Sequence, residues 1–342
     1  LYAFANVGYK DWLFFDFTAR NDWSSTLPKG NWSYFYPSAS VSVLLTEAAK
    51  TYGISFDGNA IDYGKVRFSW AKVGKDTDPY QLLSTYGTTT GENGLLTITQ
   101  PTTKANAFLK PEMSTSWEAG TEWHFFKNRL GIDFTYYDTK TVNQVMVVSF
   151  PYSSGTQSMY VNAGEISNKG VELMLNGDFV RTKDFELGAV LNLARNVNKV
   201  VSLYHENGQD IELYELGHMT GSAGVYVYAK EGEPMGDIYG KAYARDKDGN
   251  IIVGEDGLPA SVDNTKLGNI NPDFTGSFSL NARYRNLSAN ALFSFQKGGD
   301  IFSVTEYAAA HAGTAKRTED RSDITFDGVT ASGAKNTGKV SA

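Results

Sequence analysis

The segment with the residue types of a cation site is RDKDGNIIVGEDG, residues 245–257. Three oxygen-bearing side chains occupy the first, third and fifth positions of a possible calcium loop: Asp246, Asp248 and Asn250. Such a loop needs a glycine at its sixth position and a bidentate glutamate at its twelfth, but this chain has Ile251 and Gly257 there. Because both geometry-setting positions fail, we predict a hairpin turn at Asp248-Gly249 and no metal site.

Other residues able to do chemistry are scattered along the chain. The histidines lie far apart and lack metal-ligand spacing: His124, His205, His218 and His311. Cysteine is absent, which excludes thiol catalysis, disulfides and Cys-based zinc sites. Neither a nucleophile elbow nor a phosphate-binding loop is present. The carboxylates Glu118, Glu122 and Asp133 are interpreted as polar wall groups, so we predict no enzyme activity and no cofactor.

Composition indicates strands rather than helices. Aromatic residues make up 13% of the 342 residues, glycine is plentiful at 34 and proline scarce at 9. A net charge of −7 leaves no electrostatic footprint for nucleic acid. The sequence contains no run of about 18 apolar residues, so it predicts no transmembrane helix.

Strict alternation of apolar and polar residues is the main structural signal. In DWLFFDFTAR, Leu13, Phe15 and Phe17 point one way, and Asp16 and Thr18 point the other. Similar runs recur along the chain, each about 9–12 residues long, which is the length of a tilted strand crossing a bilayer. A soluble β-sandwich also alternates, but its strands are usually about 5–6 residues long.

Connection lengths alternate as well. Short turns fall at 9–11, 126–128, 180–184 and 285–288, with a longer connection at 46–63 on the same side. Long polar segments fall on the other side: 21–33, 74–110, 139–167, 196–273 and 297–342. Short periplasmic turns opposite long extracellular loops are typical of outer-membrane barrels. We therefore predict an all-β chain forming a transmembrane antiparallel β-barrel.

The aromatic residues fall into two groups, those on the predicted strands and those in the predicted outer loops. Trp12, Trp117, Trp123, Tyr136 and Tyr284 are expected in interfacial girdles or on the lipid face. Other aromatic residues lie in the predicted outer loops: Trp23, Trp32, Tyr80, Tyr86, Tyr204, Tyr214, Tyr226 and Tyr228. Their rings are candidates for substrate contact by stacking on sugar faces, but packing between loops or contact with a lid are alternatives.

Several segments, in order, resemble one known family. NAGEISNKGVE (162–172) resembles a signature of the SusC/RagA-type TonB-dependent transporters. Further similar segments are RNDWSS (20–25), YFYPSASVSV (34–43), LKPEMSTSWEAGTEW (109–123) and the late run from LGNINPDF to GGDIF (267–302). In the family a Gly-Trp pair usually follows the last serine of the segment that YFYPSASVSV resembles, but in this chain Val43 and Leu44 follow Ser42. The matches cover most of residues 1–302.

The resemblance implies a plugged barrel of about 22 strands in the bacterial outer membrane, energised by TonB. It also implies a SusD-like lipoprotein lid and a substrate that is an oligosaccharide or, for some members, a peptide. This chain is expected to supply part of the wall and loops, in contact with membrane lipid and lipopolysaccharide, with the plug domain and remaining strands lying outside it. Alternatives are a peptide-importing member, a passive porin and a secreted all-β glycan-binding module.

Overall fold

The computed structural model describes residues 1–342 except 55, 57–59, 150–155, 207–208, 219–223 and 342. The chain divides into two compact units. Unit 1 comprises Leu1–Glu212, Glu231–Glu233 and Asp273–Lys297. Unit 2 comprises Leu213–Lys230, Pro234–Pro272 and Gly298–Ala342. None of the helices within the described ranges is long and apolar enough to cross a membrane.

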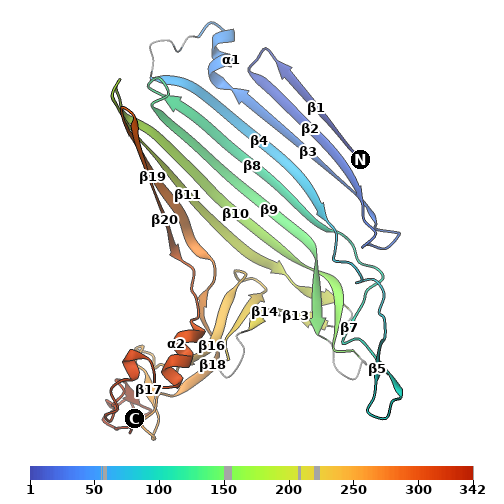
Figure 1. Ribbon diagram of the computed structural model, residues 1–342, viewed down its shortest axis with the longest axis vertical. Helices are drawn as coiled ribbons and strands as arrows, with labels where there is room; N and C mark the ends of the chain where they lie inside the picture. Colours follow the sequence, from blue (N-terminus) through green and yellow to red (C-terminus); the bar gives the residue numbers. More distant parts are fainter. Residues whose placement is uncertain (55, 57–59, 150–155, 207–208, 219–223, 342) are drawn as a thin grey trace. The chain divides into compact units, whose positions relative to one another are not determined.

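Unit 1 is built on one antiparallel sheet whose long strands follow each other in chain order (Figure 1). The strands are β1 (Tyr2–Tyr9), β2 (Leu13–Trp23), β3 (Ser33–Leu44), β4 (Ile61–Lys75), β8 (Glu112–Phe125), β9 (Leu130–Ser149), β10 (Ser158–Arg181), β11 (Phe185–Ser202), β19 (Pro272–Tyr284) and β20 (Leu287–Gly298). Each pairs with the next, so β1 and β20 are the two edges. The predicted all-β antiparallel architecture is confirmed.

Short strands occupy the connections of unit 1. They are β5 (Gly87–Thr90), β6 (Leu96–Thr99), β7 (Thr103–Lys104), β12 (Tyr204–Glu206) and β13 (Gln209–Ile211). β5 pairs with β6 and β12 with β13, while β7 adds to β10. A small hydrophobic core forms where β9, β10 and β12 meet: Val148, Val161, Ala163 and Tyr204 are all buried.

Alternation divides the large sheet into an apolar face and a polar face. The apolar face keeps large side chains exposed: Phe17, Phe68, Trp70, Trp117, Phe134, Val171 and Phe278. The polar face carries Asp16, Ser40, Ser69, Glu118, Thr135, Asn192 and Ser277, which the ladder registers place on shared rows. A continuous exposed apolar face of this size needs an apolar medium or partner to cover it.

Tight turns lie at one end of the large sheet, as the connection lengths predict (Figure 1). Their residues adopt left-handed backbone angles, for example φ 57° at Asp11, 60° at Lys127 and 52° at Arg285. The helix α1 (Leu45–Thr51) connects β3 and β4 at the same end. Polar turn residues tolerate these angles, which let consecutive strands pair directly.

The segment predicted as a loop at 139–167 is largely β-ladder, so its predicted bounds were wrong. β9 continues to Ser149 and β10 begins at Ser158, and these two residues pair with each other. The polar residues of TKTVNQ keep the strand period, and backbone pairing does not depend on polarity. Sequence polarity therefore ended the strands too early.

The stretch NAGEISNKGVE lies within β10. Asn162 Nδ2 donates to the carbonyl oxygens of Lys110 (2.8 Å) and Asn143 (3.0 Å), and its Oδ1 accepts from the Lys110 amide (2.7 Å). Gly164 has φ 83° beside a register shift between Glu165 and Ile166. The asparagine thus ties both the connection that leads into β8 and the neighbouring strand β9 to β10, and the glycine accommodates the irregularity of the ladder.

The second glycine of this stretch serves a close approach. A Cβ atom on Gly170 would lie 2.5 Å from the Arg195 carbonyl oxygen and would also meet the Tyr137 hydroxyl. Tyr137 lies opposite Gly170 in the ladder, and its hydroxyl donates to Asn196 Oδ1 at 3.1 Å. The missing side chain therefore lets the Tyr137 ring cross β10 and reach β11.

Unit 2 has a four-stranded antiparallel sheet in the order β14-β15-β16-β18. Its elements are β14 (Leu213–His218), β15 (Tyr226–Lys230), β16 (Asp237–Tyr243), β17 (Ile252–Val253), β18 (Ser261–Asn269), β21 (Val329–Thr330), α2 (Val304–His311) and a short 3-10 helix (Lys316–Thr318). A fully buried carboxylate, Asp237, is held by Lys266 Nζ at 2.8 Å and Asn269 Nδ2 at 2.7 Å. This ion pair joins β16 to β18.

Candidate functional site

The polar face of unit 1 is organised around Arg67. Its guanidinium donates to both carboxylate oxygens of Asp133, at 3.0 and 2.7 Å, and to Thr135 Oγ1 at 2.6 Å. Arg67 lies on β4 and its partners on β9, so the side chain must cross β8. It crosses at Gly120, where a Cβ atom would lie 2.7 Å from Arg67 Nε.

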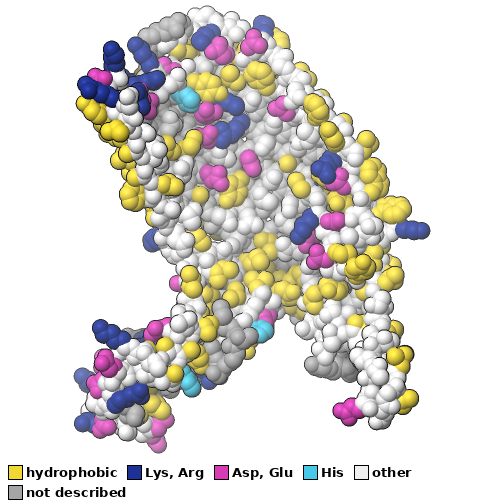
Figure 2. Space-filling model, viewed as in Figure 1, with side chains coloured by type: hydrophobic (Ala, Val, Ile, Leu, Met, Phe, Trp, Pro, Cys, Tyr) yellow, Lys and Arg dark blue, Asp and Glu magenta, His cyan; other side chains and the backbone are white. Residues whose placement is uncertain are grey.

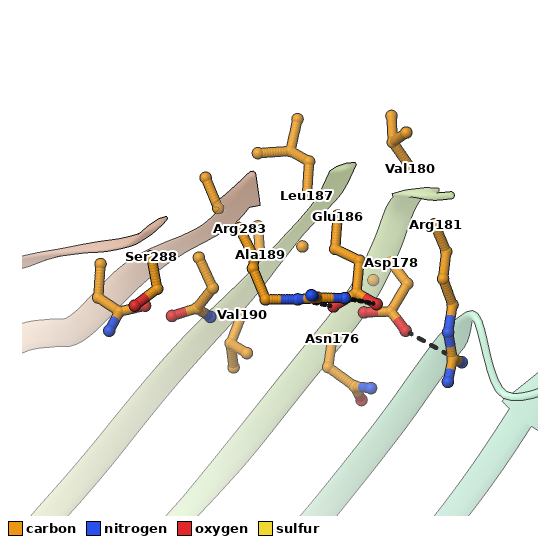
Figure 3. Close-up of a pocket in the computed structure, with 15 residues that line it drawn as sticks. Asn176, Asp178, Val180, Arg181, Glu186, Leu187, Ala189, Val190, Arg283 and Ser288 are labelled. Carbon is orange, nitrogen blue, oxygen red and sulfur yellow. Dashed lines mark hydrogen bonds and ion pairs between the residues drawn. The ribbon is translucent and has the colours of Figure 1, made fainter. Parts of the chain in front are cut away.

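A concavity of about 390 Å³ lies near the tight turns, between β10, β11, β19 and β20. Glu186 and Arg283 point toward each other there and form a two-bond ion pair of 2.7 and 3.0 Å (Figure 3). Asp178 and Arg181 form a weaker pair at 3.9 Å. Leu187 points to the opposite side of the sheet in the same view, so the two faces remain distinct at this end.

A second concavity, of about 500 Å³, lies further along the polar face. Its lining includes Arg67, Asp133, Glu172, Asn192, Thr275 and Ser277. Figure 2 shows acidic and basic side chains close together on the hollowed side of the large sheet. The charged residues of the first concavity are two cations and two carboxylates, and those of the second are one cation and two carboxylates. Both concavities offer hydrogen-bonding groups suited to holding a polar molecule.

The carboxylates Glu118, Glu122 and Asp133 occupy ladder positions on this polar face, as predicted. Asp133 is paired with Arg67, and Glu122 Oε1 accepts a hydrogen bond from His124 Nε2 at 3.1 Å. Within the described residues, no group of three or more His, Cys, Asp or Glu side chains could hold a metal ion. Two of the three acids, Asp133 and Glu122, thus have a partner on the polar face itself.

The calcium-like segment is a turn. Asp246 Oδ1 accepts from the amides of Asp248 and Asn250, both at 2.9 Å, and Gly249 has φ 85°. Hydrogen bonds from Asn250, first from its side chain, lower the pKa of Asp246. An antiparallel bridge joins Arg245 and Ile251, so the predicted hairpin turn is confirmed.

His205 binds two carboxylates outside the large ladder. Its Nε2 lies 2.6 Å from Glu231 Oε2 and its Nδ1 lies 3.2 Å from Asp210 Oδ1. Hydrogen bonds to Glu231 and then to Asp210 raise the pKa of His205, and the bond from His205 lowers the pKa of Glu231. Glu231 also accepts from the Leu203 amide at 3.1 Å, so this pair fastens the end of β11.

The predicted substrate-contact aromatics occupy different surroundings. Trp23, Trp32, Tyr80 and Tyr86 are exposed in unit 1, and Tyr80 is 95% exposed. Tyr204 is only 4% exposed and packs in the hydrophobic core with Val148 and Val161. It was wrong to group Tyr204 with surface contacts, because its alternation with polar neighbours in LYHEN hid its burial.

The structure brings two of the candidates together in unit 2. The rings of Tyr226 and Tyr228 stack at 5.7 Å with an interplanar angle of 10°. Tyr239 packs edge-on against Tyr228 at 5.6 Å, and His218 lies 6.3 Å from Tyr226. Together these four side chains form what we call the tyrosine cluster, and Tyr214 lies on the neighbouring strand β14.

Polar groups border the tyrosine cluster. Glu215 pairs with Tyr228 in the ladder, and its Oε1 accepts a hydrogen bond from His218 Nδ1 at 2.7 Å. Burial first, and then the Glu215 charge, raise the pKa of the Tyr228 hydroxyl. Sequence reasoning missed Tyr239, although the alternation in YVY (226–228) already placed two rings on one face.

Comparisons with known proteins agree with the fold. The family described as "TonB dependent receptor-like, beta-barrel" matches residues 1–330. TonB-dependent receptor P3 of Formosa agariphila is 30% identical, over 92% of this chain and 33% of its own length. TonB-dependent receptor SusC of Bacteroides thetaiotaomicron is 27% identical, over 66% of this chain and 25% of its own length.

Solved structures share the fold. The RagAB peptide transporter superposes with a TM-score of 0.73 at 22% identity, over 90% of this chain and 34% of that chain. The RagAB peptide importer in its closed-closed state gives a TM-score of 0.70 at 24% identity. The chain thus spans about a third of the length of the curated relatives and structures it matches most extensively.

Proposed function

Because the chain belongs to the TonB-dependent receptor-like β-barrel family, we propose that it forms part of the wall of an outer-membrane active transporter. The family prediction made from the motifs is confirmed, and SusC is among the relatives. The family consists of outer-membrane transporters rather than enzymes. The observation that carries the proposal is the division of one long-stranded sheet into an exposed apolar face and a polar face.

The proposed cargo is a large nutrient, specifically an oligosaccharide. On the polar face, cations stand beside carboxylates, as in Arg67–Asp133 (2.7 Å) and Arg283–Glu186 (2.7 Å). Such matched pairs supply hydrogen-bonding groups while adding little net charge, which suits a neutral polar cargo. The tyrosine cluster adds apolar ring surface together with the polar imidazole of His218, and Glu215 borders it, a combination that fits the two kinds of surface on a sugar.

The proposed partners follow from the family. A SusD-like surface lipoprotein would close over the loops, and TonB would supply energy through segments outside this chain. The apolar face would contact membrane lipid and lipopolysaccharide. The long connections, including those carrying Trp23, Trp32, Tyr80 and Tyr86, would face outward and meet the cargo or the lid.

Native mass spectrometry of the intact protein extracted in detergent from its source membrane tests this proposal. We expect a co-purifying lipoprotein and a retained ligand that loses whole sugar units on fragmentation. Loss of amino-acid residues instead would assign a peptide cargo, which the name of the RagAB transporter suggests for that protein. A protein that is soluble without detergent would contradict the membrane placement, and a barrel without plug or lipoprotein would indicate a passive porin.

Substitutions in the tyrosine cluster test whether it contacts the cargo. Replacing Tyr226 and Tyr228 together by alanine should weaken ligand retention about tenfold or more, because each stacking ring contributes of the order of 1 kcal/mol. Tyr243→Ala is the matched control, since Tyr243 is an exposed tyrosine of the same sheet outside the tyrosine cluster. Equal loss in both variants would refute a role for the tyrosine cluster.

A further inference from the structure

The apolar face of unit 1 carries a row of aromatic rings toward the end away from the tight turns. The ring centroids of Phe68 and Trp117 lie 6.5 Å apart, and those of Trp117 and Tyr136 lie 5.3 Å apart. In an outer-membrane barrel, such a row marks the level where hydrocarbon chains give way to lipid headgroups. Side chains at or just beyond it on the same face therefore meet headgroups.

The same face becomes basic at this level. Four exposed cations on β9, β10 and β11 form what we call the basic cluster: Lys140, Lys169, Arg195 and Lys199. Lys140 and Lys199 flank Ser167, each paired with it from one side, and Lys169 lies two residues along β10 from Ser167. Ladder spacing separates the Lys140 and Lys199 backbones by about 10 Å.

Arg195 completes the basic cluster on β11. It pairs with Val171, which in turn pairs with Tyr136, so the backbone of Arg195 lies level with the aromatic row. Lys169 is a diagonal neighbour of both Arg195 and Lys199, at about 7–8 Å between backbones. Long basic side chains can lay their apolar stems along the face and extend their charges to the headgroup level.

The basic cluster has more positive charge than its neighbours neutralise. Lys140 pairs with Glu165 at 2.7 Å and Lys169 with Asp138 at 2.9 Å. Neither Arg195 nor Lys199 forms an ion pair with a side chain among the residues described. Four cations against two carboxylates leave a net charge of +2 on this part of the face.

We propose that the basic cluster binds the phosphate groups of an outer-leaflet glycolipid. Phosphate oxygens accept charge-assisted hydrogen bonds from ammonium and guanidinium groups, and the Ser167 hydroxyl lies between Lys140 and Lys199 as a further donor. A lipid is the occupant because the basic cluster continues the exposed apolar face, so the medium that covers Phe134 and Trp117 also reaches it. The inference rests on the proposed membrane placement.

The test measures phosphorylated lipid retained by the intact protein after detergent extraction and after reconstitution with lipid A or with dephosphorylated lipid A. Arg195→Gln combined with Lys199→Gln removes two cations without leaving a carboxylate unpaired. We expect retention of lipid A to fall on the order of 30-fold. The control, Lys127→Gln combined with Lys183→Gln, makes the same charge change in the tight turns and should retain as much lipid A as the wild type.

Each outcome decides. Preference for lipid A over its dephosphorylated form, lost only in the Arg195/Lys199 variant, supports the inference. Equal retention in all variants overturns it, as does inorganic phosphate binding as tightly as lipid A, which would indicate a free-anion site. Loss of the lipoprotein rather than lipid in the variant would assign the basic cluster to an acidic protein partner. A wild-type protein carrying no membrane lipid at all would instead refute the proposed membrane placement.

Discussion

Replacing Phe134 by arginine tests the assignment of the two faces most directly. Phe134 is 40% exposed on β9 and pairs with Thr121 on β8 and Leu173 on β10. Its row lies between the rings of Trp117 and Tyr136 on one side and those of Trp123 and Phe125 on the other. In the proposed membrane placement these two aromatic rows bound the hydrocarbon layer, which puts Phe134 near its middle.

The expected cost follows from that depth. Arginine at the midplane of a barrel's lipid face destabilises the folded state by about 2–4 kcal/mol. Met174 is the matched control: it lies on β10 beside Leu173, pairs with Asp133, and is 42% exposed on the polar face. Arginine there meets water and a carboxylate, so Met174→Arg should cost less than about 1 kcal/mol. Thr135 is a poorer control because its hydroxyl accepts from Arg67.

The assay is urea titration of the intact protein refolded into phospholipid vesicles, with folded barrel quantified by its heat-modifiable gel mobility. Phe134→Arg should move the midpoint to lower urea, whereas Met174→Arg should leave it nearly unchanged. Equal losses in the two variants would mean that the apolar face does not meet lipid. A larger loss at Met174 would mean that the faces have been assigned the wrong way round.

Two further predictions concern residues outside the lipid face. Lys266→Met leaves the buried Asp237 carboxylate without its cation and should destabilise β16 and β18 by about 3 kcal/mol in denaturant-dependent hydrogen exchange. The exposed pair Lys241–Asp263 is the control, and Lys241→Met should cost under about 1 kcal/mol, so equal costs would contradict the burial argument. The pKa of His205 is raised, so the stability that protonated His205 contributes is complete below its ordinary pKa of about 6.5 and is lost as pH rises through its folded-state pKa. The pKa of Glu231 is lowered, so the stability that ionised Glu231 contributes is present above its ordinary pKa of about 4.3 and is lost at more acidic pH. Exchange of the Leu203 amide, corrected for intrinsic rate, should therefore be slowest between about pH 4.3 and 6.5, and Glu231→Gln should abolish that dependence if the reasoning holds.

The features predictable from sequence are those encoded by near neighbours in the chain. Period-two alternation, as in Leu13, Phe15 and Phe17, is a property of each strand, so both faces could be assigned before any pairing was known. Tight turns were predictable for the same reason, since a few polar residues such as Lys127 and Asn128 must connect two strands. The family motifs added an identity that alternation alone does not supply.

The remaining features depend on residues distant in sequence. Arg67 reaches Asp133 only because Gly120, on the strand between them, has no side chain, and nothing near Arg67 in the sequence encodes this. Tyr204 is buried because β9 and β10 extend beyond their predicted ends and pack against it. Loop chemistry was therefore the least predictable part, since it depends on which connections fold onto one another.

The two faces differ in how their charges are balanced, and this difference suits the two functions proposed for the sheet. On the polar face, Arg67 and Arg283 are each matched by a carboxylate at 2.7 Å, which keeps the wall hydrophilic without a strong field. On the apolar face, Arg195 at the aromatic row and Lys199 beyond it add cations that the two local carboxylates do not balance. A matched wall lets a neutral polar cargo make and exchange hydrogen bonds, whereas an unmatched rim retains an anion. The same alternation that builds the barrel wall can thus separate passage of a cargo from anchorage in the membrane.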